Sequence, residues 1–317
     1  MRHEQINLTL GQPYMQEQDD VTSQPALVLT REIAESLICE DEVIRASEYT
    51  QIDADAAVLI GSAGKLLILD GLKTLPVDLA KTLSTKSTIW SLEGLSVLDD
   101  DTAKVLGESD EGLNLPGLTS LSASAAGEIA NVNGCDLVLD GLTTICEAVA
   151  ANLARYHGQE ESTLSLDGLT EISEGIAAEL KNHRGWLSLG GLSEISDEVA
   201  LQLGKHQGEN LYLSSVKNLS DFAIRALAEH PNCVELGGLP EVQIARFKEL
   251  HAEQKKFHEF ASYVRFALHI HDPLNPYQRT TDFDGLVDEV QSCMDCDEDI
   301  RRTRQLRDLL NQLNLDV

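Results

Sequence analysis

A short phrase recurs along the chain at a nearly constant period, and this repeat constrains the fold more than any other feature. The phrase is Leu-x-Leu-x-Gly-Leu-x-x-Ile/Leu, as in LILDGLKTL, LVLDGLTTI and LSLGGLSEI. Its glycine position is occupied, at spacings of 23 to 27 residues, by Gly71, Gly94, Gly117, Gly141, Gly168, Gly191, Ser215 and Gly238. An earlier fragment, IRASEYTQI, indicates a ninth, degenerate copy. Repeats of this length are typical of solenoids, in which each unit packs against its neighbours.

Each copy has a strand half and a helix half. Leu164, Ser165 and Leu166 alternate with the period of two that is typical of a strand. The residues that follow share one face at helical spacing, as in Ile172, Ile176, Ala177 and Leu180. Serines lie where an N-cap is expected, at Ser173 and Ser196. Glycines after the helical spacing predict helix ends near Gly158, Gly185 and Gly208.

These patterns predict an α/β solenoid with parallel strands on one face, short helices on the other, and C-terminal helices as a cap. Aromatic residues are 4% of the chain, so its core must consist of Leu, Ile, Val and Ala. We expect residues 1–43 to form an N-terminal cap and residues 44–243 a solenoid of about nine coils. Residues 244–317 predict a helical cap or an accessory helical domain, with helices over 242–268, 283–294 and 297–313.

The phrase resembles the leucine-rich repeat family, and it is most similar to short bacterial variants, over roughly residues 44–243. The resemblance implies a solenoid that presents its strand face to a protein partner. One slot departs from the family pattern, which has Asn or Cys three residues after the second strand leucine. Here that slot holds Leu72, Leu95, Leu118, Leu142, Leu169, Leu192, Val216 and Leu239. We therefore expect the turn amides to bond to backbone groups or water.

Charge and the lack of targeting signals limit the possible partners. The 317 residues include 53 acidic and 24 basic ones, for a net charge of −29. This balance argues against binding to nucleic acid or to an anionic membrane surface. The N-terminus lacks the apolar run of a secretory signal, and no stretch is apolar enough to span a membrane. We expect a cytoplasmic protein whose six cysteines are reduced.

The strand face offers the best candidate for a binding site. On neighbouring coils, Trp186 and Tyr212 are expected to form an aromatic anchor. Small or polar side chains surround them at Ser165, Ser188 and Asn210, and acidic side chains at Asp140 and Asp167. The acids have two interpretations, which remain open: they steer a basic partner, or they serve the turn before glycine.

Histidines and cysteines are candidates for metal or redox sites. His157, His183, His206 and His230 recur near expected helix C-termini, where a surface capping role is favoured over metal binding. Cys293 and Cys296, with His269 and His271 upstream, form the sharpest local motif. The other cysteines are expected to be partly buried.

No phosphate-binding loop or hydrolase motif is present in the sequence. The favoured hypothesis is therefore a non-enzymatic module, with no cofactor, that binds a protein partner with a basic surface. Two alternatives remain: a metal- or redox-dependent function in the C-terminal helices, or self-assembly through those helices.

Overall fold

The computed structural model describes residues 26–159 and 161–270, and in this part of the chain nine strands form one parallel sheet. The strand order is β11-β10-β9-β8-β7-β6-β5-β4-β2, so each coil adds one strand beside the last. The strands are β2 (Val43–Arg45), β4 (Leu66–Ile68), β5 (Thr88–Ser91), β6 (Leu113–Asn114), β7 (Asp136–Val138), β8 (Thr163–Ser165), β9 (Trp186–Ser188), β10 (Asn210–Tyr212) and β11 (Cys233–Glu235). The ninth strand predicted from the degenerate copy is β2, which pairs with β4.

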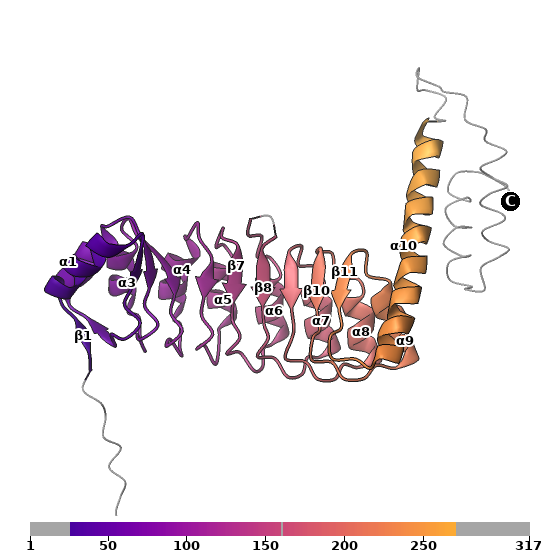
Figure 1. Ribbon diagram of the computed structural model, residues 1–317, viewed down its shortest axis with the longest axis horizontal. Helices are drawn as coiled ribbons and strands as arrows, with labels where there is room; N and C mark the ends of the chain where they lie inside the picture. Colours follow the sequence, from indigo (N-terminus) through magenta and orange to yellow (C-terminus); the bar gives the residue numbers. More distant parts are fainter. Residues whose placement is uncertain (1–25, 160, 271–317) are drawn as a thin grey trace, which may run out of the picture.

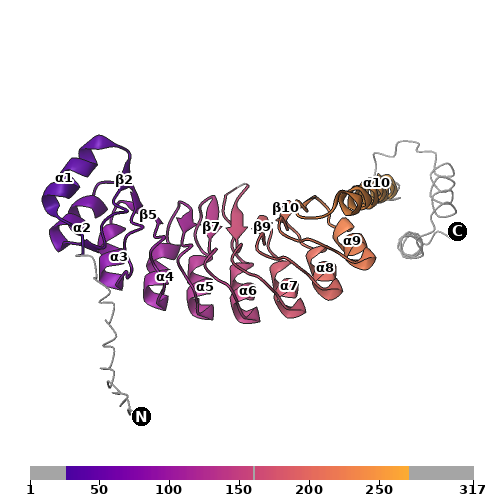
Figure 2. The same cartoon turned by 60° about the horizontal axis from the view of Figure 1, so that its bottom comes forward.

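A row of short helices covers the other side of the sheet. Successive helices contact one another, as α7 contacts α8. Figure 2 shows the helices along the outer side of a shallow arc and the strands along its inner side. They are α2 (Ala54–Gly61), α3 (Val77–Leu83), α4 (Asp100–Gly107), α5 (Ala123–Ile129), α6 (Glu147–Leu153), α7 (Glu174–Leu180), α8 (Asp197–Leu203) and α9 (Asp221–Ala228). The predicted α/β solenoid is confirmed (Figure 1).

The repeated leucines form the core between the two layers. Leu164 and Leu166 are fully buried, and Leu180 of α7 reaches the same core from the helix side. Alternation along the strand therefore places Ser165 on the opposite face. Burial of each such leucine stabilises the fold by about 1.5–3 kcal/mol before conformational entropy is counted.

Backbone carbonyls accept hydrogen bonds from the amides of the turn after each strand. This is one of the two alternatives expected from leucine in the slot that holds Asn or Cys in the family pattern. The Leu169 amide donates to the Leu166 carbonyl at 3.1 Å, and the Leu166 amide donates to the Ser188 carbonyl of the next coil at 3.0 Å. Equivalent bonds recur at Leu142 and Leu192. The leucine in this slot is thus free to face the core, where Leu169 is fully buried.

The predicted helix starts are confirmed, but the predicted helix ends are wrong. Ser173 Oγ accepts from the Ile176 amide, and Ser196 Oγ accepts from the Val199 amide. However, α7 ends at Leu180 and α8 at Leu203, five residues before Gly185 and Gly208. These glycines serve close approach between coils instead. A Cβ on Gly208 would lie 1.9 Å from the Gly185 carbonyl oxygen.

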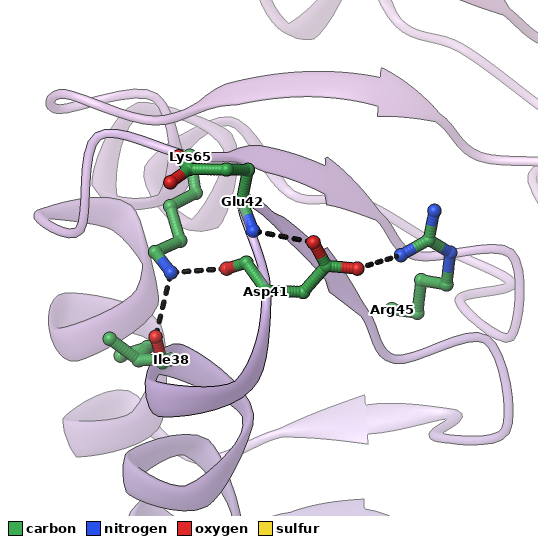
Figure 3. A network of polar contacts seen from close by, with 5 residues as sticks. All are labelled: Ile38, Asp41, Glu42, Arg45 and Lys65. Atoms are coloured by element: carbon green, nitrogen blue, oxygen red, sulfur yellow. Dashed lines mark hydrogen bonds and ion pairs between the residues drawn. The ribbon is translucent and has the colours of Figure 1, made fainter.

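At the N-terminal end, α1 (Arg31–Glu40) packs on α2, and β1 (Val28–Leu29) pairs with β3 (Gln51–Ile52). Lys65 ties this end to the sheet, because its ammonium group donates to the carbonyls of Ile38, at 2.7 Å, and Asp41 (Figure 3). Donation to the end of a helix satisfies carbonyls that have no partner within the helix. Asp41 also accepts from the Glu42 amide and from Arg45, which holds the pKa of its carboxyl below the usual value.

At the C-terminal end, α10 (Glu241–Ile270) contacts α9 and runs across the end of the array (Figure 1). Phe247 is buried, and Ile244 and Leu250 pack partly against the core, so the start of α10 covers the last coil. The expected helix over 242–268 is confirmed, while those over 283–294 and 297–313 lie outside the described residues. Within the described ranges, no helix is both long and apolar enough to cross a membrane.

Candidate protein-binding surface

Trp186 and Tyr212 lie side by side on the strand face. The pairing of β9 with β10 places Leu187 beside Leu211 in the core and leaves the flanking residues on the other side. The two ring centroids are 6.3 Å apart, and the ring planes are inclined by 58°. Such a tilted contact suits aromatic rings and keeps both half-buried. The structure thus brings together the two residues expected to form an aromatic anchor.

Polar groups fix the indole of Trp186. Its Nε1 donates to Glu209 Oε2 at 3.3 Å. Asn210 lies beside the same indole: in the amide orientation that satisfies its polar atoms, its oxygen accepts from Nε1 at 3.1 Å. The ring edge is therefore held by β10 and the residue before it.

Asp140 and Asp167 connect successive coils. Asp140 Oδ1 accepts from Ser165 Oγ at 2.6 Å and from the Asp167 amide at 3.0 Å. One coil further, Asp167 Oδ1 accepts from Ser188 Oγ at 2.6 Å and from the Gly190 amide at 2.6 Å. Ser165 is only 8% exposed, so its hydroxyl positions Asp140 and offers a partner little contact area. The sequence did not predict this bonding, although the recurrence of Asp followed by Ser 21 to 25 residues later is visible in it.

The surface around the aromatic pair is negatively charged. Among the residues of the nine strands, the one basic side chain is Arg45 at the far end, and it is bonded to Asp41. Exposed acids lie on β7 and β11, at Asp136 and Glu235. Burial, together with the nearby Glu235 and Cys233, raises the pKa of Tyr212, so its hydroxyl stays protonated at neutral pH.

Trp90 is a third aromatic residue on this face, and the sequence analysis did not identify it. The pairing of β4 with β5 shifts register between Leu67 and Ile68, because Leu67 pairs with Ile89 and Ile68 with Ser91. The extra residue is Trp90, which is 40% exposed. β-Bulges commonly re-aim a side chain in this way. The sequence does contain a signal for the bulge. Two residues, instead of one, separate the inward residues Ile89 and Leu92.

The expectation of surface histidines is wrong for three of the four. His183, His206 and His230 are buried, and only His157 is exposed. The reason is the length of each helix. α7 and α8 end three residues before His183 and His206, and α9 ends two residues before His230, so the chain turns back into the core at these positions. Tyr156, not His157, occupies the equivalent slot in the preceding coil, and its ring stacks on His183.

Cysteine burial was also predicted wrongly. Cys39, Cys135, Cys146 and Cys233 are free thiols and all are exposed. In the described part of the chain, no group of three or more His, Cys, Asp or Glu side chains is placed to hold a metal ion. Cys293, Cys296 and His271 lie outside the described residues, as does the side chain of His269.

Two hollows lie away from the aromatic pair. The larger, of about 560 Å³, is lined by residues of α3, β5 and α4 and of the segments that follow α3 and α4, with Lys81, Lys104 and Asp101 among the lining side chains. The smaller, of about 380 Å³, lies beside His206 and is lined by Lys205, Glu229 and Gln254. Neither contains a residue predicted for binding.

Comparison with known protein families gives no match for this chain, and no curated protein matches it.

Proposed function

We propose that this protein is a non-enzymatic binding module whose strand face, centred on Trp186 and Tyr212, receives a protein partner with a basic surface. The observation that carries the proposal is the contact between these two aromatic rings, 6.3 Å apart on adjacent strands. Trp and Tyr are the side chains most often found at the energetic centre of protein interfaces. On this chain they stand on two adjacent three-residue strands of the parallel sheet.

Charge supports a basic partner. The chain carries a net charge of −29, and Asp136, Asp167 and Glu235 are exposed on or beside the strands near the aromatic pair. A field of this sign attracts a positively charged surface and speeds its association, an effect that salt screens. Asp140 and Asp167 contribute to that field while they also connect the coils.

The repeat phrase supports membership of the leucine-rich repeat family, and we include this family assignment and a cytoplasmic location in the proposal. Self-assembly through the C-terminal helices is the alternative use of the chain. Light scattering on the full chain and on residues 1–255, which keep the buried Phe247, distinguishes the two. Self-assembly through the C-terminal helices predicts that the full chain has the mass of an oligomer and the shortened chain that of a monomer.

Affinity capture with matched variants tests the proposal. Proteins retained from a native lysate by the wild type are compared with those retained by a Trp186→Ala/Tyr212→Ala variant and by Trp90→Ala. Loss of an interface hot spot costs about 2 kcal/mol or more, or about 30-fold in affinity. We expect a partner that is lost with the double variant, kept with Trp90→Ala, and bound more weakly at high salt. A partner held equally by all three proteins would place the binding surface elsewhere.

Metal analysis of protein purified without a histidine tag tests the remaining alternative. Stoichiometric zinc that disappears in a Cys293→Ser/Cys296→Ser variant would favour a metal-dependent function of the C-terminal region.

A further inference from the structure

Four aromatic rings form a buried column inside the solenoid, one from each of four successive coils. Tyr156, His183, His206 and His230 each follow the last helical leucine of their coil by three residues. Their ring centroids are separated by 6.0, 6.1 and 5.4 Å, and neighbouring planes differ by 6°, 24° and 20°. The three histidines are 0–1% exposed. Three ionisable rings therefore lie stacked within the core.

The hydrogen bonds of the column determine which ring nitrogen carries the proton in neutral His230 and His206. The Asn232 amide donates to His230 Nδ1 at 3.1 Å, so the proton of His230 lies on Nε2. His230 Nε2 is 3.2 Å from His206 Nδ1 and donates to it, which leaves the proton of His206 on Nε2. Among the described residues, that Nε2 and both nitrogens of His183 have no hydrogen-bond partner at full bonding geometry, although backbone groups of Trp186, Ala154 and Tyr156 lie near His183 and partly offset the decrease in its pKa that burial causes. A second proton on His206 or His230 would have to occupy a nitrogen that now accepts a hydrogen bond.

The neighbouring titratable groups offer protonated rings little compensation. His183 faces Tyr156 and His157, and His230 faces His251 of α10. Lys205 and Glu229 line the hollow beside His206. Burial lowers the pKa of His183 to about 4, of His206 to about 3 and of His230 to about 4, and the neighbouring histidines lower the values further.

The column is linked to the aromatic pair on the strand face through two glycines that precede β9 and β10. His183 precedes Trp186 by three residues, and His206 precedes Asn210 by four. Between them, Gly185 and Gly208 lie against the imidazoles: a Cβ on either would come within 2.9 Å of the His183 or His206 Nε2 atom. A shift of either ring therefore displaces the segment that leads into β9 or β10.

The N-terminal coils have no such column. The equivalent slot, three residues after the last core side chain of the helix, holds Ala63, Lys86, Ser109 and Val132 in the coils of α2, α3, α4 and α5. Lys86 is the one titratable side chain among these four, and it is exposed. The chain is thus divided into coils with and without buried ionisable rings.

We propose that the histidine column is an acid-sensitive element that opens the coils of β9, β10 and β11 when its rings are protonated, and thereby separates Trp186 from Tyr212. Opening gives each imidazole a hydrated environment in which it binds a proton below about pH 6.5. At pH 5 this multiplies the opening equilibrium constant by about 30 for each histidine that is released. The consequence for partner binding rests on the proposed function, whereas the opening itself does not.

The two tryptophans provide a local readout in the full chain. The sequence has two, Trp90 in β5 and Trp186 in β9. A Trp90→Phe variant therefore reports on Trp186 alone, and a Trp186→Phe variant reports on Trp90 alone. We expect the Trp186 emission to change between pH 6.5 and pH 4 with uptake of more than one proton, while the Trp90 emission stays constant over the same range.

Matched variants separate the column from other titrating groups. In the Trp90→Phe background, His183→Phe/His206→Phe keeps rings in the slots and should move the Trp186 transition to lower pH by removing two proton-binding sites. His157→Gln removes an exposed imidazole that faces His183, and should move the transition by much less than the double variant. Glu209→Gln tests whether the transition reports only on the carboxylate bonded to the indole. A transition that persists unchanged in the double histidine variant, or that both tryptophans share, would overturn the proposal.

A direct titration keeps the test valid if the double histidine variant does not fold. Nitrogen-15 NMR of the wild type should show His230 and His206 protonated on Nε2 at pH 7.5, with no titration near pH 6.5 while the coils remain folded. Imidazoles that titrate near pH 6.5 in intact coils would overturn the proposal. Failure to find a partner would leave these readouts unaffected and would count against the proposed function alone.

Discussion

Ser165 donates its hydroxyl to Asp140 across two successive coils, with Oγ and Oδ1 2.6 Å apart. The same carboxylate oxygen accepts the Asp167 amide, so Asp140 holds both the strand β8 and the turn that follows it. The connection repeats between Asp167 and Ser188. Acidic residues at these positions therefore stabilise the stacking of the coils in addition to setting the charge of the surface.

Replacement of Asp140 by Ala should destabilise the fold by about 1–3 kcal/mol, because a nearly buried hydroxyl and an amide lose their acceptor. Asp140→Asn keeps an oxygen in place and should cost less. Urea denaturation measures both. Glu171→Ala removes the same charge from an exposed position and should change the free energy of unfolding by less than about 0.5 kcal/mol. Equal effects of the two alanine variants would show that charge alone matters.

Cys146→Ser should stabilise the protein by about 0.5–2 kcal/mol. Cys146 is the N-cap of α6 and makes no side-chain cap bond, although its backbone is extended like that of Ser173 at the start of α7. A serine hydroxyl there can accept from the Val149 amide as Ser173 does from Ile176. Thermal denaturation checks the prediction, with Cys135→Ser, an exposed thiol outside any cap, as the control. No difference between the two variants would contradict a capping effect.

Gly208→Ala should destabilise the protein by about 1–3 kcal/mol or more, since the new methyl group would overlap the Gly185 carbonyl oxygen and the His206 ring. At Gly237, by contrast, the nearest atom to an added Cβ is the Ser214 carbonyl oxygen at 3.7 Å. Gly237→Ala should therefore leave stability nearly unchanged. Chemical denaturation of the two variants is a matched comparison, and similar losses would refute close approach as the reason for Gly208.

The free energy of unfolding should decrease as the pH falls from 7 to 5. The pKa values of His183, His206 and His230 lie at about 4, 3 and 4 in the folded state, below the value of about 6.5 expected after unfolding. The unfolded state thus binds more protons below pH 6.5, and stability is full above that pH and lost below it. Each histidine accounts for about 2 kcal/mol at pH 5. Urea denaturation at pH 7.5, 6 and 5 measures the slope, and the absence of a decrease would contradict the neutral, buried column.

The sequence was sufficient to predict the layers, because the two periods, two and about 3.6, alternate without interruption in each copy. It also predicted the caps at Ser173 and Ser196. For the turn amides it left backbone groups and water as alternatives, and the structure shows backbone bonds. Helix ends were misplaced because glycine suits both a helix C-cap and a close contact, and only the position of the neighbouring coil distinguishes these roles. Gly185 and Gly208 have the second role.

For the surface, the adjacency of Trp186 and Tyr212 followed from the repeat spacing alone. Trp90 was missed because a one-residue insertion changes which face a side chain occupies. The histidine column was missed because His157 was grouped with the other three, whereas its neighbour Tyr156 is the residue that enters the core. A single residue of offset thus separates an exposed ring from a buried one.

For the protein partner that we propose, the spacing of the strands in the large sheet favours a helical segment over an extended one. Parallel strands lie about 4.8 Å apart. One turn of an α-helix rises about 5.4 Å, and two residues of an extended chain about 6.7 Å. A helix laid across the strands would drift by about 0.6 Å per coil and keep one side chain near each of three or four coils. An extended segment would lose that match after a single coil. The distance between strands is therefore closer to the pitch of an α-helix than to the two-residue repeat of an extended chain.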